Sequence, residues 1–539
     1  MRLPTSRNRF QNVRRLKMPW RLGLIFAVLA VLLLLPTSRL SACKFNQEQR
    51  FPTLNTTLPI ETSDNQGSTE TTSDKEQKTL TVALPIGDDA LKALRLLFLA
   101  RQSGLLNQEP GQYIGQSIQL SDLQQFEGPL TINLINVSQD TGVTKDQIAD
   151  WQAAGNMPDI IYCLNAATSP GLSQALDLND YLFASPLLTA EHIYPSALKS
   201  SHAGKILYGI PYLASVPLIY LNQSLLGQYQ MLAPSISWTW QNWLEYSSLL
   251  QTRISEAGYG ATPDILANLA IDPVSLNDQL KKSIYVFDNP ASLLQFLPAS
   301  LNPNLGWATW NDQQFAFQDD SFLDAANWLN QYTQAGMTPL HLDNAQQLAA
   351  FSGADAIQSS RVCMWLGNSS ELAAWHQQTR IKISESLVPC SPAEIAAGES
   401  ATPDSQLNLR MPLQVRSLIV NKTTDEPELA AEFAAFLALD ADSLLIQSRY
   451  QLYEGFVPVV KEDVIWEAMV ERQLYGRLLQ DLQAKMPYAY CSNQQLSPNW
   501  NRVLNSAIGF YGKELMTAAD ASEIDSIMEQ LIIAAKKLS

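Results

Sequence analysis

Histidine and cysteine are scarce in this chain of 539 residues, which contains four histidines and five cysteines. No histidines stand in the H-E-x-x-H spacing of zinc proteases, and no cysteines stand in the C-x-x-C spacing of zinc ribbons and thioredoxin-like proteins. The G-x-S-x-G turn of serine hydrolases and the G-x-x-x-x-G-K-S/T loop of phosphate-binding proteins are also absent. The sequence therefore predicts no enzyme, no metal site and no cofactor.

Basic residues are outnumbered by acidic ones, with 36 Lys and Arg against 52 Asp and Glu, which gives a formal net charge of −16. The first 43 residues hold eight of the basic residues and no acidic one, so the rest of the chain has a net charge of −24. A surface this acidic repels phosphate backbones and anionic lipid headgroups. The composition therefore argues against nucleic acid, and against attachment to a membrane through a basic patch.

The prominent apolar run, residues 22–35, is 14 residues long, which is short of the roughly 20 that a membrane-spanning helix needs. Residues 1–21 carry seven Lys or Arg and no acid, and small residues follow the run, as is typical of a secretory signal. Residues 40–43 (LSAC) also resemble a bacterial lipobox, which implies a signal peptide over 1–43 and lipidation of Cys43. A plain signal cleaved after Ala42 and an uncleaved anchor are the alternatives. All three place the rest of the chain outside the cytoplasmic membrane.

Residues 44–78 are rich in small polar and acidic residues and contain no Trp or Tyr. Such a segment cannot bury enough apolar surface to offset its ordering entropy, so we expect a disordered tether. The 461 residues from 79 to 539 are too many for one simple core, and two or three lobes are expected. Four cysteines in this part either form disulfides or pack as small buried side chains, and the sequence leaves their pairing open: Cys163, Cys363, Cys390 and Cys491.

Strand-like and helix-like segments alternate in the first part of the folded region. Residues 79–84, 130–137 and 160–162 are β-branched or apolar runs typical of strands, and apolar residues recur at helical spacing over 91–98. This alternation predicts an α/β fold with some parallel pairing. Residues 100–130, rich in Gln and Leu, are expected to form an insertion. Later helices are predicted over 319–336, 427–436 and 521–538.

Several further stretches resemble the extracellular solute-binding proteins of ABC importers, the family that includes bacterial sugar-binding lipoproteins. The strongest are residues 204–212 (GKILYGIPY) and 218–222 (LIYLN), which are similar to the family's GKiYGiPy and liYyN segments. Weaker matches follow the order and spacing of the family at 155–161, 176–182, 238–243, 357–367 and 455–459. Ser360 and Cys363 depart from the family pattern, which has Gly and Ala there. The resemblance covers residues 79–539.

The resemblance implies an α/β, two-lobed clamshell of the periplasmic-binding-protein type (type II), in which each lobe is a sheet flanked by helices. It places lobe 1 at about 79–213 and 383–438, and lobe 2 at about 218–375 and 442–539. The chain is then expected to cross between the lobes near 213–217, 376–382 and 438–442. Such proteins close around a solute by hinge motion and present it to a membrane permease, without chemistry on the solute.

A carbohydrate presents flat C–H faces and many hydroxyls, which aromatic rings and polar side chains match. Several candidate residues could therefore serve either as ligand contacts or as structural residues, because carboxylates cap helices and aromatic rings fill cores. These candidates are Asp88, Asp89, Tyr212, Trp307, Trp310, Trp365, Asn368, Tyr453 and Glu454.

The sequence thus predicts a lipid-anchored, extracytoplasmic solute-binding component of an ABC transporter, with a mono- or oligosaccharide favoured as its ligand and a permease as its partner. A polyamine, an organic anion or a peptide bound by the same fold is the alternative. A surface glycosidase or lyase would need a carboxylate pair such as Asp319 and Asp320. At the start of a predicted helix, however, these residues are expected to act as caps.

Overall fold

The structure is a computed structural model, and it describes residues 77–102, 128–139, 142–163, 175–182, 185, 187–203, 205–260, 282–311, 314–342, 347, 351, 354–390, 410–450, 454–472, 476–491 and 508–538. The chain divides into two compact units, Met1–Thr72 and Ser73–Ser539, and every described residue belongs to the second. The predicted signal peptide, Cys43, nearly all of the tether and Tyr453 lie outside the described residues, as do residues 103–127 of the expected insertion.

The larger of two main sheets has seven strands. Its order is β12-β6-β11-β3-β1-β2, and β13 pairs with β11 beside this path. β1 is parallel to β2 and β3, whereas β11 is antiparallel to β3 and β6. The bounds are β1 Lys78–Leu84, β2 Leu130–Asn136, β3 Ile160–Cys163, β6 Ile210–Ser215, β11 Pro412–Val420, β12 Val457–Pro458 and β13 Tyr490–Cys491.

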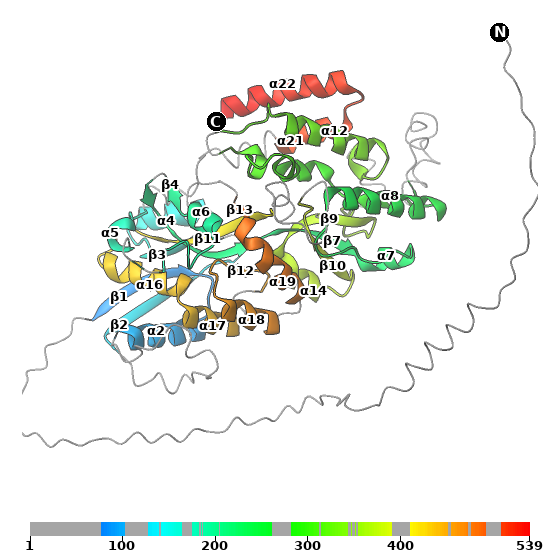
Figure 1. The fold of residues 1–539 in the computed structure, drawn as a ribbon. Helices are drawn as coiled ribbons and strands as arrows, with labels where there is room; N and C mark the ends of the chain where they lie inside the picture. The colour runs from blue at the N-terminus through cyan, green and yellow to red at the C-terminus, as the bar shows by residue number, and fades with distance from the viewer. Residues whose placement is uncertain are drawn as a thin grey trace, which may run out of the picture. The chain divides into compact units, whose positions relative to one another are not determined.

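Helices cover both faces of this sheet, which explains why β3 and β6 are apolar and buried along their whole length. In the view of Figure 1, α2, α17 and α18 lie below the sheet and α4, α5 and α6 lie above it. The helices are α2 Asp88–Gln102, α4 Lys145–Ala154, α5 Asn179–Leu182, α6 Pro195–Ser200, α16 Pro427–Leu439, α17 Ala441–Arg449, α18 Asp463–Arg472 and α19 Gly476–Lys485. Asp88 and Asp89 occupy the first turn of α2, where a negative charge stabilises the helix.

The second sheet has four strands in the order β10-β7-β9-β8. β7 is antiparallel to both β10 and β9, and β8 is parallel to β9. The bounds are β7 Pro217–Asn222, β8 Tyr285–Phe287, β9 Val362–Asn368 and β10 Ile383–Leu387. Its helices are α7 Gln223–Gln228, α8 Trp240–Glu256, α11 Leu297–Leu301, α12 Asp320–Gln334, α14 Leu372–Gln377, α21 Gly509–Thr517 and α22 Ala521–Leu538.

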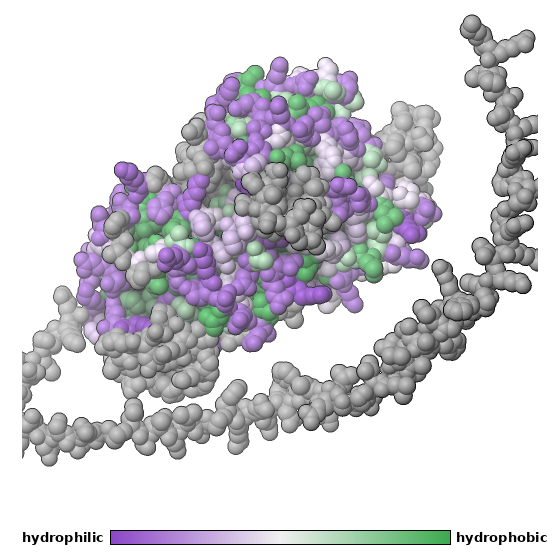
Figure 2. Space-filling model, in the orientation of Figure 1, coloured by the Kyte–Doolittle hydropathy of each residue, from purple (hydrophilic) through white to green (hydrophobic). Residues whose placement is uncertain are grey.

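Each sheet has its own hydrophobic core, and the smaller sheet contributes to both. Side chains alternate across a strand, so Leu218 and Tyr220 of β7 join the core of the larger sheet, while Ile219 and Leu221 join the second core. Large apolar side chains that remain exposed are scattered along the chain rather than gathered in one segment. Figure 2 accordingly shows a mostly hydrophilic face with small apolar groups.

The division of the chain between the two sheets differs from the expected ranges in two places. β10 lies in the four-stranded sheet, although residues from 383 onward were expected in lobe 1. The helices α17, α18 and α19 contribute Leu444, Ile465 and Leu482 to the core of the larger sheet, although residues from 442 onward were expected in lobe 2. No crossing therefore occurs at 376–382 or 438–442. The chain instead leaves the larger sheet between β6 and β7, returns to it between β10 and β11, and passes to the second core again between β13 and α21.

Three of the four cysteines, Cys363, Cys390 and Cys491, are free thiols, and all four are buried. No pair of them is therefore bonded, and they pack as small apolar side chains. The cap predicted at Asp319 is present: its carboxylate accepts a hydrogen bond from the Ser321 main-chain N–H at the start of α12. This assigns Asp319 the structural role that its position before a helix indicates.

Candidate functional site

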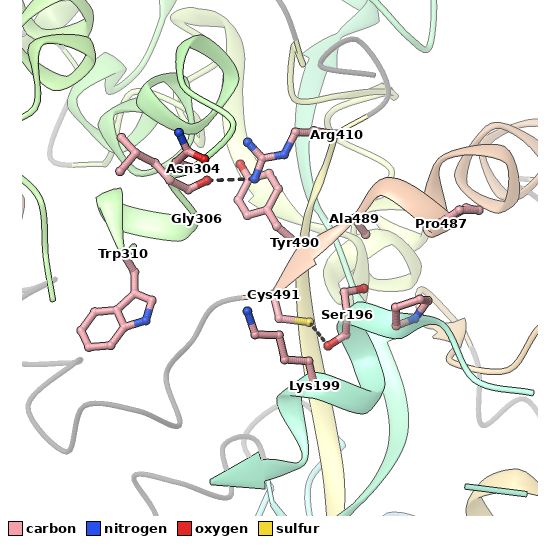
Figure 3. A pocket seen from close by; sticks show the side chains of 12 residues that line it. Ser196, Lys199, Asn304, Gly306, Trp310, Arg410, Pro487, Ala489, Tyr490 and Cys491 are labelled. Carbon is pink, nitrogen blue, oxygen red and sulfur yellow. Dashed lines mark hydrogen bonds between the residues drawn. The ribbon is translucent and has the colours of Figure 1, made fainter. Parts of the chain in front are cut away.

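A cavity of about 250 Å³ is lined by segments from both cores. The larger sheet contributes α6, the approach to β11, and β13 with the short helix η8 (Met486–Tyr488) before it. The second core contributes the loop around η5 (Trp307–Thr309). The described lining residues are Pro195, Ser196, Lys199, Asn304, Leu305, Gly306, Trp310, Arg410, Pro487, Ala489, Tyr490 and Cys491 (Figure 3).

Arg410 joins the two halves at one end of this cavity. Its guanidinium group donates hydrogen bonds to the main-chain oxygens of Ala299 at 2.5 Å and Leu305 at 2.8 Å, two residues that form a small apolar cluster of their own with Ala316. The same group lies 4.7 Å from the ring centroid of Tyr490, within the range of a cation–π contact. Because Arg410 directly precedes β11, it ties the start of a strand of the larger sheet to a loop of the second core.

The loop that carries Trp310 has an unusual backbone. Ala308 and Thr309 both have positive φ angles, 51° and 61°, in the left-handed region that non-glycine residues rarely adopt. The Gly306 main-chain N–H donates to the Trp310 carbonyl at 2.7 Å, which closes the turn, and the Trp310 ring packs edge-on to Phe315 at 5.0 Å. This local structure holds Trp310 at the cavity wall although only 5% of the residue is exposed.

Comparisons with known proteins identify the family of this chain. The family described as bacterial extracellular solute-binding protein matches residues 124–472, which is more than half of the chain. The chain belongs to this family. Membership implies a location outside the cytoplasmic membrane. A search of curated proteins finds no match.

Solved structures with the same fold include three binding proteins. An ABC substrate-binding protein from Listeria monocytogenes, in complex with cycloalternan, is 11% identical, with a TM-score of 0.54 over 85% of this chain and 98% of that one. The sugar-binding protein MalE from Xanthomonas citri is 12% identical, with a TM-score of 0.55 over 86% and 97%. A cyclic alpha-maltosyl-1,6-maltose binding protein from Arthrobacter globiformis is 13% identical, with a TM-score of 0.56 over 85% and 99%. These likenesses confirm the predicted two-lobed α/β fold.

Among the predicted ligand-binding residues that the structure describes, which exclude Tyr453, Trp310 is the one that lines the cavity between the cores of this solute-binding protein. Three other aromatic candidates are almost fully buried. Tyr212 is 1% exposed and its hydroxyl donates to the Gln447 side chain, while Trp307 is 7% exposed and donates to Gln295 at 3.0 Å. Trp365 is 2% exposed and packs in a cluster with Tyr220 and Trp375. Trp310 is as buried as these residues, so what separates them is the cavity: none of the three lines it, and their contacts assign them to packing.

The polar candidates lie elsewhere. Asn368 ends β9, where its side chain accepts from the Ser370 main-chain N–H and donates weakly to Gln414 of the larger sheet at 3.4 Å. Glu454 is half-buried beside a close contact between the two halves at Gly455. Asp88 lines a separate cavity of about 380 Å³ between α2 and β2. The structure therefore does not bring Asp88, Asp89, Asn368 or Glu454 together with Trp310.

Lys199, Arg410 and Tyr490 line the cavity, and sequence analysis missed all three. No motif marks them, because each lies on a short element: Lys199 near the end of the six-residue α6, Arg410 just before β11, and Tyr490 at the start of the two-residue β13. They are also separated by up to 291 residues in the chain. Only the tertiary structure places them around one space.

The described residues also limit the chemistry of the site. They contain no group of three or more His, Cys, Asp or Glu side chains arranged to hold a metal ion. Burial raises the pKa of the Cys491 thiol to about 12, so this thiol is protonated and a poor nucleophile at neutral pH.

No described helix is long and apolar enough to cross a membrane. A larger cavity, about 680 Å³, lies within the second core beside Asp288, Asp355 and Lys513.

Proposed function

We propose that this protein captures a small solute, with a mono- or oligosaccharide favoured, between its two lobes and delivers it unchanged to an ABC permease. The observation that carries the proposal is the cavity lined by both cores, with Trp310 on one side and Tyr490 on the other. Aromatic rings bind the C–H faces of sugars, and the polar groups of Ser196 and Asn304 are suited to hydroxyls. The three similar proteins of known structure bind sugars, among them cycloalternan and cyclic alpha-maltosyl-1,6-maltose, which supports a carbohydrate here.

The connection between the lobes supports a hinge. The chain passes from the larger to the smaller sheet through Val216 alone, between β6 and β7. Val216 and Ser369, which follows β9, are joined by two hydrogen bonds. The Val216 N–H donates to the Ser369 hydroxyl at 3.0 Å, and the Ser369 N–H donates to the Val216 carbonyl at 2.8 Å. A short link anchored at one end concentrates rotation in a few backbone angles, as in hinge closure of binding proteins.

Attachment to the membrane through lipidated Cys43 is part of the proposal, because the acidic chain after residue 43 disfavours electrostatic binding to anionic lipid. Expression of the full chain with a radiolabelled fatty acid should label the protein and leave it in the membrane fraction. The Cys43→Ser variant should be unlabelled and released. Equal labelling of both variants would contradict the anchor without affecting the proposed solute binding.

The binding proposal is tested by a thermal-shift screen of the purified full chain against sugars, amino acids, polyamines and peptides. A ligand at 100 times its dissociation constant stabilises the folded state by about 2.7 kcal/mol, which is readily measured. Trp310→Ala should weaken binding of a sugar hit about tenfold or more, because stacking residues at the centre of a site dominate affinity. Trp307→Ala is the matched control: it should lower stability and leave the affinity of the folded protein unchanged.

Two outcomes would overturn the carbohydrate assignment. Stabilisation by polyamines or peptides and by no sugar would assign the other solute class to the same fold. Release of a new product from an oligosaccharide, followed by chromatography, would show a glycosidase or lyase rather than a pure binder.

A further inference from the structure

We propose that the interlobe cavity binds an anionic group of its solute, a phosphate or carboxylate on a sugar-sized molecule, through Lys199 and Arg410. This inference rests on the proposed function and narrows it to a class of solute. It concerns the charge of the cavity wall, which differs from that of the chain as a whole.

The described wall of the cavity carries two cations, Lys199 and Arg410, and none of its described residues is acidic. Acidic residues outnumber basic ones by 52 to 36 in the whole chain, so a wall with two cations and no described acid runs against the composition. A concave site lined by one sign of charge concentrates ligands of the opposite sign. The local charge therefore favours an anion where the overall charge would repel one.

The described partners of the Arg410 guanidinium are all neutral. They are the main-chain oxygens of Ala299, Asn302 and Leu305 and the ring of Tyr490. Carbonyl oxygens satisfy N–H groups but leave the full positive charge, and the C-terminal end of the five-residue α11 offers only partial compensation. Burial lowers the pKa of Arg410, which reflects the cost of keeping this charge away from water. Buried charges in proteins are normally paired, and a solute anion would supply that pair.

Lys199 approaches the same space from α6, on the same lobe as Arg410. Figure 3 shows its side chain extending from α6 toward the region between Trp310 and Tyr490, with Arg410 beyond the Tyr490 ring. Hydrogen bonds from ammonium or guanidinium groups to carboxylate or phosphate are about twice as strong as neutral ones. A solute whose anionic group binds Lys199 and Arg410 on the larger-sheet lobe would also lie against Trp310 of the second core, and contacts to both lobes would stabilise the closed form.

The size of the cavity agrees with this role. Its volume of about 250 Å³ is slightly below the roughly 300–1,000 Å³ typical of small-molecule sites. It therefore suits one sugar ring or one charged group of a larger solute. Trp310 and Tyr490 line the cavity together with the two cations, and such a mixed wall of aromatic and charged groups fits a charged sugar better than a simple inorganic anion.

The test compares matched neutral and anionic ligands by isothermal titration calorimetry on the full chain: glucose with glucose 6-phosphate, galactose with galacturonate, and inorganic phosphate alone. We expect the anionic member of at least one pair to bind about tenfold or more tightly than the neutral member. Lys199→Gln should remove most of that preference, and Lys199→Arg, which retains the charge, should keep it. Lys205→Gln, at an exposed cation outside the cavity, is the matched control and should change nothing.

Each outcome decides between the two proposals. Equal affinity for both members of every pair, or a preference that survives Lys199→Gln, overturns the anionic inference and leaves a neutral carbohydrate site standing. Binding of phosphate that depends on Lys199, without binding of any sugar, supports the anionic site and overturns the carbohydrate assignment. Absence of binding by every probe overturns both. Arg410→Gln is a second variant, and circular dichroism will show whether it folds. Whether or not it folds, the Lys199 variants decide if the cavity prefers anionic ligands.

Discussion

At the scale of single residues, a group of charges around His192 is the clearest feature outside the cavity. The imidazole contacts the Glu462 carboxylate through Nδ1 and the Leu439 carbonyl through Nε2 at 3.0 Å. Burial lowers the pKa of His192, but the hydrogen bonds to Glu462 and Leu439 and the charges of Glu462 and Asp440 outweigh it and raise the pKa above its ordinary value of 6.5. The protonated form is therefore stabilised in the folded state.

This raised pKa makes stability depend on pH in a definite direction. A histidine whose folded pKa exceeds its unfolded pKa contributes stability fully below pH 6.5 and loses it as the pH rises through the folded value. The unfolding free energy should therefore fall across that window, with a slope below the one-proton limit of about 1.4 kcal/mol per pH unit. In urea titrations at several pH values, His192→Asn and Glu462→Gln should each flatten this slope, and the double variant should add little more. A slope unchanged in His192→Asn would contradict the assignment.

A second titrating residue acts at lower pH. Burial, with a smaller effect from the nearby Asp355 charge, raises the pKa of Asp288 from 3.8 to about 6. A carboxylate with a raised folded pKa destabilises the fold once it ionises, so stability is lost as the pH rises from 4 through 6. Asp288→Asn should be more stable than the parent at pH 7 and nearly equal to it at pH 4, by thermal unfolding in both buffers. A variant less stable than the parent at pH 7 would show that the charge is compensated.

At the scale of elements, one buried amide joins two helices of the second core. The Asn330 side chain on α12 donates to the main-chain oxygens of Leu515, Met516 and Ala518 at the end of α21, at 2.9, 3.1 and 3.0 Å. The last carbonyls of a helix have no partner within the helix, so this side chain satisfies them from outside. Asn330 therefore acts as a C-terminal cap supplied by a neighbouring helix.

Removal of this cap should be costly. Asn330→Ala removes this donor from the Leu515 and Met516 oxygens and leaves the Ala518 oxygen with Gln334 alone, and we expect a loss of about 1–3 kcal/mol in unfolding free energy by chemical denaturation. Asn330→Asp should cost more, because a carboxylate would face the same three oxygens. Gln334→Ala is the matched control: Gln334 donates to the Ala518 oxygen at 3.0 Å from a partly exposed position, so its loss should cost less than about 1 kcal/mol. Equal losses in both alanine variants would show that burial does not matter here.

At the scale of the whole molecule, the two lobes touch closely at a glycine. Gly455, on the segment leading to β12, has φ = 81°, and a Cβ atom placed on it would lie 2.2 Å from the Ser369 carbonyl oxygen of the other lobe. Only a residue without a side chain allows this approach. Ser369 is also hydrogen-bonded to Val216, the residue that connects β6 to β7, so the contact at Gly455 lies beside this connection between the lobes. The contact therefore limits how the lobes move relative to each other.

Gly455→Ala should therefore force the lobes apart or strain the backbone, at a cost of about 1–3 kcal/mol in unfolding free energy. Gly227→Ala in α7 is a control of opposite sign: nothing lies within 4 Å of its added Cβ, and alanine favours a helix over glycine by about 0.5–1 kcal/mol. Small-angle scattering should give a larger radius of gyration for Gly455→Ala than for Gly227→Ala. Equal stability and size in the two variants would contradict a close contact at this position.

Local sequence patterns anticipated several individual elements. The strands expected at 79–84, 130–137 and 160–162 correspond to β1, β2 and β3, and the helices expected from 427 and 521 correspond to α16 and α22. Periodicity reports which residues are buried within an element, and it is set by neighbours along the chain. It does not report which sheet a strand joins, because β10 pairs with β7 through residues about 160 positions away. The expected lobe ranges were therefore wrong at both later crossings.

The sequence by itself determined the fold class, the family and the likeness of the N-terminus to an export signal, because each depends on residue order over short stretches. It also named Trp310, together with Trp307 in the same apparent loop, among nine candidate ligand contacts, and their role in binding stays a prediction. Only the tertiary structure decided that Tyr212, Trp307 and Trp365 are packed and that Lys199, Arg410 and Tyr490 surround one cavity. The physical reason is that burial and local charge depend on segments brought together from distant parts of the chain, which no short pattern records.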